Sequence, residues 1–143
     1  MKTAERKWVG QPLFRREDAA LLQGHGQFID DLTVPRLAHV AYLRSPHAHA
    51  RIVQVDTRRA ETHPGVFAVL TGEEVAQLTR PQRGRIPLPN SPKVYALAYP
   101  KVRYVGEPVV AIAAVDRATA EDAAELVEVG YEVCPLWFTL KRR

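Results

Sequence analysis

Short stretches of apolar residues, either alternating with polar ones or uninterrupted, predict several β-strands. In residues 37–44, apolar side chains occur on both faces of the predicted strand, so we expect both faces to be covered. Residues 51–56 alternate more regularly and predict its neighbouring strand. Between them, Pro46 lacks an N–H donor and disfavours one continuous central strand. We predict the other strands at residues 66–70, 101–104, 109–115 and 128–133, with a brief extended stretch at 27–31.

Three further segments predict helices. Residues 16–22 are a short helix candidate, which is terminated by the glycines that follow it. Residues 71–78 form a second, with two acidic side chains near its positive end. Asp116 is the predicted N-cap of a third, in which apolar residues recur at helical spacing as far as Val127. Helices interspersed among several strands place the fold in the α+β or α/β class.

Residues 79–100 contain five prolines and four basic side chains, and we expect no regular structure there. Connections of this length in a compact domain are usually functional, partner-binding or disordered. The chain contains no internal repeat and no low-complexity segment.

The composition indicates one globular domain, because 143 residues with 46% apolar and 25% charged side chains suit a single core. Cys134 is the one cysteine, which excludes an intramolecular disulfide and predicts a reducing compartment. The sequence contains neither an apolar run long enough to cross a membrane nor a signal-peptide pattern at residues 1–7. We therefore expect a cytoplasmic protein without a membrane span.

The formal charge of +4 comes from basic residues at the two ends of the chain. Inside the chain, six basic side chains follow one another without an intervening acid. Only Tyr95 and Tyr99 lie among them, whereas nucleic-acid modules interleave more aromatic side chains for stacking. We predict a contact surface there, not a nucleic-acid site. These basic residues are Arg80, Arg83, Arg85, Lys93, Lys101 and Arg103.

His47 and His49 are two residues apart and would project to the same side of an extended segment, as metal ligands sometimes do. A third ligand is not evident, because Cys134 is distant and Asp56 has no ligand spacing. We favour a structural role for the two histidines at a strand entry. The apolar residues around Cys134 predict burial, not a nucleophile.

Two other motifs have weak functional interpretations. The residues 24–26, Gly-His-Gly, resemble the opening of a dinucleotide-binding loop, but the third glycine and the apolar helix are missing. Glu107 lies between Gly106 and Pro108, so the backbone fixes the direction of its carboxylate. Without a partner, Glu107 is more typical of a turn or interface residue than of a general base.

Taken in order, the motifs of this chain resemble the N-terminal α/β-hammerhead domain of the molybdopterin-binding large subunit of the xanthine dehydrogenase and aldehyde oxidase family. The nearest likeness is to the carbon monoxide dehydrogenase large-subunit branch. The resemblance covers about residues 9 to 135 and implies an α+β fold, an α/β-hammerhead with a mixed sheet and flanking helices. It rests on residues 16–31, 43–52, 64–72, 102–109, 120–127 and 131–132.

The resemblance implies part of an oxidoreductase. Family members use a molybdenum pterin cofactor and pass electrons to iron–sulfur and flavin partners, but the cofactor loops and the active-site glutamate lie in domains that follow the hammerhead. We therefore expect no catalytic, cofactor-binding or metal-binding residue in this chain. The expected partners are the remaining domains or subunits of a molybdenum hydroxylase.

The predicted organisation is an N-terminal tail at 1–8, the hammerhead domain at 9–135 and an atypical tail at 136–143. That apolar and then basic tail departs from the family and predicts a truncated, frame-shifted or split product that is inactive alone. One alternative is a stand-alone protein- or ligand-binding module that uses the basic, proline-rich loop 80–103. Another is an independent metal enzyme built on His47 and His49.

Overall fold

A computed structural model describes residues 8, 10–82 and 93–135 of the chain. The chain divides into two compact units, residues 1–36 and 37–143. The first contains helix α1 (Asp18–Leu22), which confirms the predicted helix, although none of its residues is buried. The expected extended stretch at 27–31 is wrong, because a 3-10 helix forms at Ile29–Asp31. There the Asp31 carboxylate accepts the N–H of Phe28 and favours the turn.

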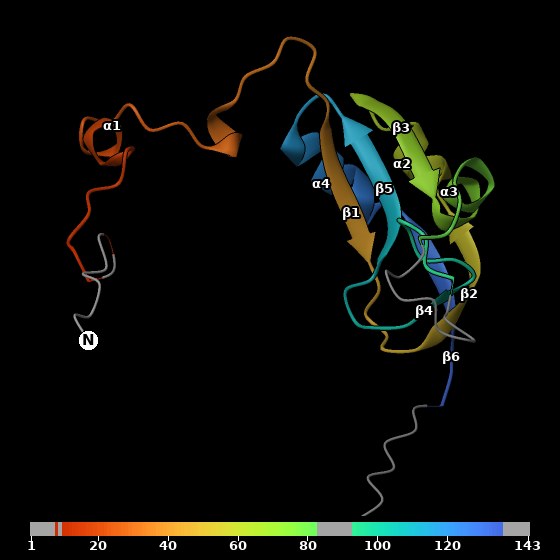
Figure 1. Ribbon diagram of the computed structural model, residues 1–143. Helices are drawn as coiled ribbons and strands as arrows, with labels where there is room; N and C mark the ends of the chain where they lie inside the picture. The colour runs from red at the N-terminus through yellow and green to blue at the C-terminus, as the bar shows by residue number, and fades with distance from the viewer. Residues whose placement is uncertain (1–7, 9, 83–92, 136–143) are drawn as a thin grey trace, which may run out of the picture. The chain divides into compact units, whose positions relative to one another are not determined.

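The second unit contains two three-stranded sheets, with strand orders β1-β5-β3 and β4-β2-β6 (Figure 1). Every strand pairing among the described residues is antiparallel. The α+β hammerhead class is confirmed, but two antiparallel sheets replace the expected mixed sheet. The strands are β1 (His39–Arg44), β2 (Ala50–Asp56), β3 (Val66–Thr71), β4 (Lys101–Val102), β5 (Pro108–Ala114) and β6 (Glu128–Val133).

Strands β1 and β2 lie in different sheets, so the prediction that they are neighbours is wrong. Strand β5 takes the centre of the first sheet, because its valine, isoleucine and alanine side chains are half-buried or buried on both faces. Strand β1 is consequently an edge strand. One of its faces is about half exposed, at Val40 (51%) and Tyr42 (47%), contrary to the expected cover on both sides.

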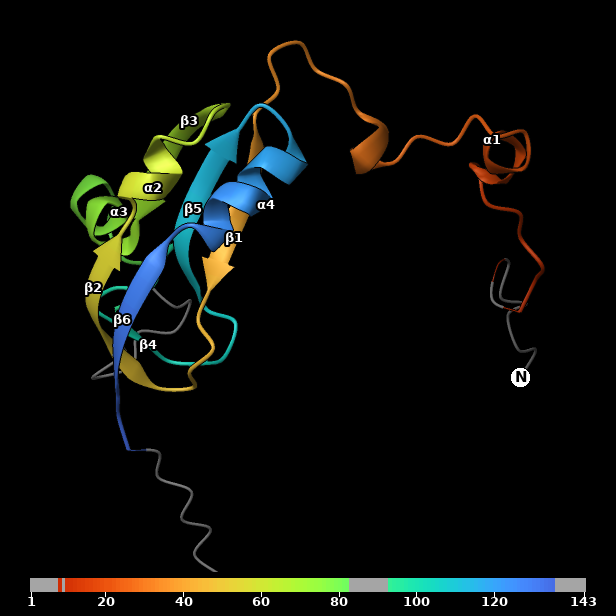
Figure 2. The ribbon, with the colours of Figure 1, turned by 180° about the vertical axis from the view of Figure 1, so that it is seen from behind.

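Helix α4 (Arg117–Glu125) covers one face of the β1-β5-β3 sheet (Figure 2). Asp116 is its N-cap, as predicted, and accepts the N–H of Thr119 at 2.8 Å. This hydrogen bond lowers the pKa of Asp116. Helix α3 (Gly72–Leu78) is also confirmed and begins with a reciprocal Thr71–Glu74 capping box.

The sequence did not predict helix α2 (Arg58–Glu61), because four residues are too short to show a helical period. Local contacts stabilise it. Asp56 accepts hydrogen bonds from the backbone N–H and the guanidinium of Arg58. These bonds lower the pKa of the Asp56 carboxyl to about 2.

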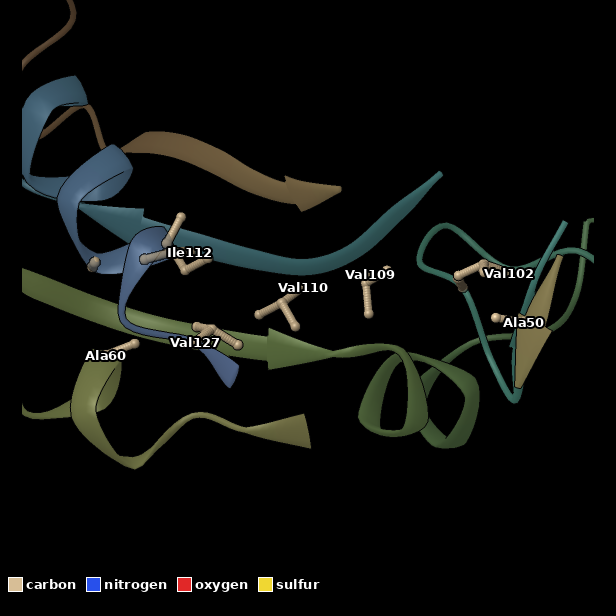
Figure 3. Packing of buried hydrophobic residues seen from close by; sticks show 10 residues of the cluster. Ala50, Ala60, Val102, Val109, Val110, Ile112 and Val127 are labelled. Carbon is tan, nitrogen blue, oxygen red and sulfur yellow. The ribbon is translucent and has the colours of Figure 1, made fainter. Parts of the chain in front are cut away.

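One continuous hydrophobic core joins the two sheets (Figure 3). Ile112, Val110 and Val109 from β5 pack at its centre, and Val102 and Ala50 extend it into the second sheet. Leu97 and Ala98, which belong to the predicted irregular segment 79–100, are buried too. That segment therefore contributes to the core as well as to the surface.

Candidate functional site

Two motifs that are far apart in the sequence meet around the buried Ser45. Its N–H donates to the carbonyl of Glu107 at 2.9 Å, and its carbonyl accepts the N–H of Gly106 at 2.8 Å. The Arg44 guanidinium also donates to the Gly106 carbonyl at 2.9 Å. The Ser45 hydroxyl lies 3.0 Å from both the N–H and the carbonyl of His47. Ser45 thus holds the Pro-His segment against the Gly-Glu-Pro turn.

Glu107 lies inside this turn, and its side chain is only 5% exposed. Its carboxylate accepts the backbone N–H of Arg103 and lies 3.6 Å from the Arg103 guanidinium. Gly106 permits the turn because its φ is +87°. The sequence did not identify Arg103 as the partner of Glu107, although the two residues are four positions apart. The geometry supports a turn-stabilising role for Glu107.

Arg103 connects the turn to the basic stretch. Besides pairing with Glu107, its guanidinium donates to the carbonyls of Lys93 and Lys101, at 3.0 and 3.1 Å. One of the six basic side chains is therefore engaged in intramolecular hydrogen bonds and an ion pair. Arg83 and Arg85, on which the binding-module alternative also depends, lie outside the described residues.

His47 packs its ring edge-on against Tyr131, with ring centroids 4.9 Å apart. Burial raises the pKa of the Tyr131 hydroxyl, against an opposing hydrogen bond with Ser45. The carbonyl of His49 accepts the N–H of Cys134 at 2.9 Å. These contacts support the structural role that we favoured for the histidines.

Nothing in the described ranges supplies the missing metal ligand. No three His, Cys, Asp or Glu side chains converge there. Asp56 is engaged by Arg58 instead. Cys134 is only partly buried, so its expected burial is incomplete. It follows the end of β6, where Val133 is 64% exposed.

Gly24 and Gly26 follow α1 in the first unit, and Gly24 has a φ of +74°. The next regular element is the 3-10 helix Ile29–Asp31, not a long helix whose N-terminus could hold a pyrophosphate. The dinucleotide interpretation therefore gains no support from the local structure.

The structure reveals a surface that the sequence did not indicate, the outer face of the β1-β5-β3 sheet. The strand register aligns two apolar rows across it, Val40–Ala113–Ala68 and Tyr42–Ala111–Leu70. Val40, Tyr42 and Leu70 are 51%, 47% and 40% exposed. We call these six residues the apolar sheet face. Helix α4 lies against the opposite face (Figure 2).

A cleft of about 510 Å³ runs along the free edge of β1, beside α4. Its helical wall carries Arg117, Glu121, Ala124 and Glu125. Arg117 pairs with Glu121 at 2.7 Å. Strand pairing creates this cleft, so no local sequence signal could have identified it.

The described residues do not fit a molybdenum pterin cofactor. The buried carboxylate, Glu107, is occupied by Arg103, and no metal-ligating cluster accompanies it in these ranges. None of the described helices is long and apolar enough to cross a membrane.

Comparison with known families decides the relationship. The sequence model described as "Aldehyde oxidase and xanthine dehydrogenase, a/b hammerhead domain" matches residues 23–135. The chain belongs to this family, as its hammerhead domain. This result confirms the resemblance that the ordered motifs indicated. The predicted domain boundaries next to residues 8 and 136 stay predictions.

Two curated relatives illustrate the similarity. The chain is 44% identical over 135 residues to the 6-hydroxypseudooxynicotine dehydrogenase complex subunit gamma of Paenarthrobacter nicotinovorans, covering 90% of this chain and 17% of the relative. It is 40% identical over 122 residues to the carbon monoxide dehydrogenase large chain of Afipia carboxidovorans, covering 85% of this chain and 15% of the relative. The chain thus spans about a sixth of the length of these relatives, which are named as subunits or chains of larger enzymes.

Solved structures share the fold. Quinoline 2-oxidoreductase from Pseudomonas putida 86 superposes with a TM-score of 0.79 and 43% identity, covering 86% of this chain and 16% of that one. The Cu,Mo-CO dehydrogenase gives a TM-score of 0.75 and 38% identity, covering 88% of this chain and 16% of that one.

Proposed function

We propose that this hammerhead domain is a structural, docking part of a molybdenum hydroxylase large subunit and carries none of its catalytic groups. The observation that carries the proposal is the family match over residues 23–135, combined with the small share of each relative that the chain covers. The oxidoreductase chemistry, with the molybdenum pterin cofactor, would belong to other domains. Iron–sulfur and flavin subunits would complete the electron path, in the cytoplasm.

The apolar sheet face is the docking surface in this proposal. Contiguous exposed apolar side chains commonly mark interaction sites, whereas single ones are ordinary. The occupant is the rest of the large subunit, because more than four fifths of each relative lies outside the matched region. A buried interface would remove Leu70 and its neighbours from water.

Affinity purification of the tagged chain from its native cells tests the docking role. We expect co-purifying polypeptides with the cofactor domains of this family, together with molybdenum. Leu70→Glu should reduce their recovery at least tenfold, since it places a charge in the apolar face. The matched control is Leu78→Glu, at an exposed leucine of α3 (75%), which should leave recovery unchanged. Purification of the chain without such polypeptides would contradict the proposal.

The catalytic half of the proposal has a separate test. The purified chain should not oxidise aldehydes, purines or carbon monoxide with an artificial electron acceptor. Turnover that Glu107→Gln abolishes would show that Glu107 has a catalytic role, against its assignment to the turn.

A further inference from the structure

The first compact unit of the chain buries none of its described residues. Within residues 10–36, which we call the N-terminal segment, the large apolar side chains are in contact with water. The most exposed are Phe14 (93%), Leu22 (88%) and Ile29 (86%). A single exposed apolar side chain is ordinary, but a concentration of them in one short segment is typical of an interaction surface. The others are Leu13, Leu21, Phe28, Leu32 and Val34, at 43–67%.

The N-terminal segment lacks the means to form a stable core by itself. Units of fewer than about 40 residues usually need a disulfide, a metal or a partner in order to fold. The single cysteine, Cys134, lies outside the segment, and the described residues contain no cluster of metal ligands. Helix α1 is five residues long, whereas isolated helices below roughly 12 residues are marginal in water. Stability must therefore come from a surface outside this unit.

Local hydrogen bonds prepare the segment for such a surface. The Asp18 carboxylate accepts the N–H of Arg15 at 3.0 Å, where α1 begins. Asp31 accepts the N–H of Phe28 at 2.9 Å in the same way, at the 3-10 helix. Each turn leaves its apolar side chains exposed. Turns that are already formed reduce the conformational entropy that binding costs.

Charge does not select the partner of the segment, because its acidic and basic side chains nearly balance. Nucleic acids and anionic membrane surfaces select clusters of lysine and arginine instead. The segment therefore fits an apolar protein surface. Its charged residues are Arg15, Arg16 and Arg36 on one side and Glu17, Asp18, Asp30 and Asp31 on the other.

The relatives indicate where that surface lies. The match to the 6-hydroxypseudooxynicotine dehydrogenase subunit covers 90% of this chain, and the uncovered remainder is shorter than the N-terminal segment. The superposition on quinoline 2-oxidoreductase covers 86% and likewise includes part of the segment. Part of the segment thus recurs in proteins of which this chain spans only 17% and 16%. The length outside this chain can supply the missing surface.

We propose that the N-terminal segment folds upon docking into an apolar groove of the cofactor-bearing part of the large subunit, with Phe14, Leu22 and Ile29 as anchors. Folding and binding are coupled, because the segment buries its apolar side chains only in the groove. This inference rests on the proposed function but uses a surface other than the apolar sheet face.

Hydrogen–deuterium exchange of the purified full chain, and of the assembly that co-purifies with it from native cells, tests the coupling. We expect residues 13–34 to exchange about tenfold or more slowly in the assembly. Equal rates in an assembly that contains the cofactor domains would overturn this inference and leave the proposed function intact. Failure of those domains to co-purify would overturn both. Slow exchange in the chain alone would show that the segment folds without a partner, against the inference.

A charge at an anchor tests the apolar character of the contact. Leu22→Asp should reduce the recovery of cofactor-domain polypeptides about tenfold or more, because the groove would have to bury a carboxylate. Gln11→Asp adds the same charge at an exposed polar residue of the segment and should leave recovery unchanged. Neither residue is buried, so the urea midpoint of the chain should not move. Undiminished recovery with Phe14, Leu22 and Ile29 all replaced by serine would refute the anchors.

Photo-crosslinking identifies the partner surface directly. With p-benzoylphenylalanine in place of Leu22, we expect crosslinks to a polypeptide that carries the cofactor domains. Crosslinks to an iron–sulfur or flavin polypeptide, or to residues of this chain, would overturn the assignment.

Discussion

At the scale of single residues, the buried polar groups of this domain hold two motifs together. Ser45 and Glu107 are the buried polar residues of the described chain, and they hydrogen-bond through their backbones. The Arg103 guanidinium forms an ion pair with the Glu107 carboxylate and donates a hydrogen bond to the carbonyl of Lys93. A side chain that the sequence made a weak candidate for catalysis thus has a stabilising role.

Removing the Glu107 carboxylate should destabilise the fold. Glu107→Gln keeps an acceptor for the Arg103 N–H and should lower the free energy of unfolding by about 1.5 kcal/mol, whereas Glu107→Ala leaves that donor unsatisfied and should cost about 3 kcal/mol. Urea unfolding measures both. The control is Glu132→Gln, which breaks an exposed pair with Arg51 and should cost less than about 0.5 kcal/mol. Equal effects at the two positions would contradict this assignment.

Ionisation of the Tyr131 hydroxyl should lower the free energy of unfolding at alkaline pH. Because burial raises its pKa, the folded state retains a proton that the unfolded state loses above about pH 10. The contribution is complete below that pH and disappears as the pH rises through the folded pKa. Tyr131→Phe keeps the ring against His47 without this titration, so its unfolding free energy should fall less steeply between about pH 9 and about pH 11. Parallel pH profiles of the two proteins would contradict the effect.

At the scale of elements, the position of helix α3 depends on a glycine. A Cβ atom at Gly72 would lie 2.0 Å from the carbonyl oxygen of Ala98, too close for any side chain. The backbone of the helix at Gly72 therefore packs directly against the backbone of the buried segment at Ala98. Strand β5 has a comparable role among the strands, since its burial on both faces makes β1 and β3 the edges of its sheet.

Gly72→Ala should lower the free energy of unfolding by about 3 kcal/mol, because the backbone at Ala98 would have to move. Thermal unfolding measures the change. Gly130→Ala is the matched control, since its Cβ would meet Gln54 at an ordinary 3.7 Å, and it should change stability by less than about 0.5 kcal/mol. A neutral Gly72→Ala variant would show that α3 can shift without cost.

At the scale of the whole molecule, the unit from residue 37 onward has one covered and one uncovered sheet surface. Helix α4 covers one side of the β1-β5-β3 sheet, and the apolar sheet face remains in water on the other. Docking in a large subunit would bury this face.

The sequence was sufficient for the family, for most helices and strands and for the N-cap at Asp116, because capping and periodicity are local properties of neighbouring residues. It could not show that β1 and β2 belong to different sheets, that Arg103 is the partner of Glu107, or that β1 has a free edge. Strand order and side-chain pairing depend on contacts between residues far apart in the chain. Only the folded structure decides which of the available apolar strands is central, and therefore which surfaces remain for partners.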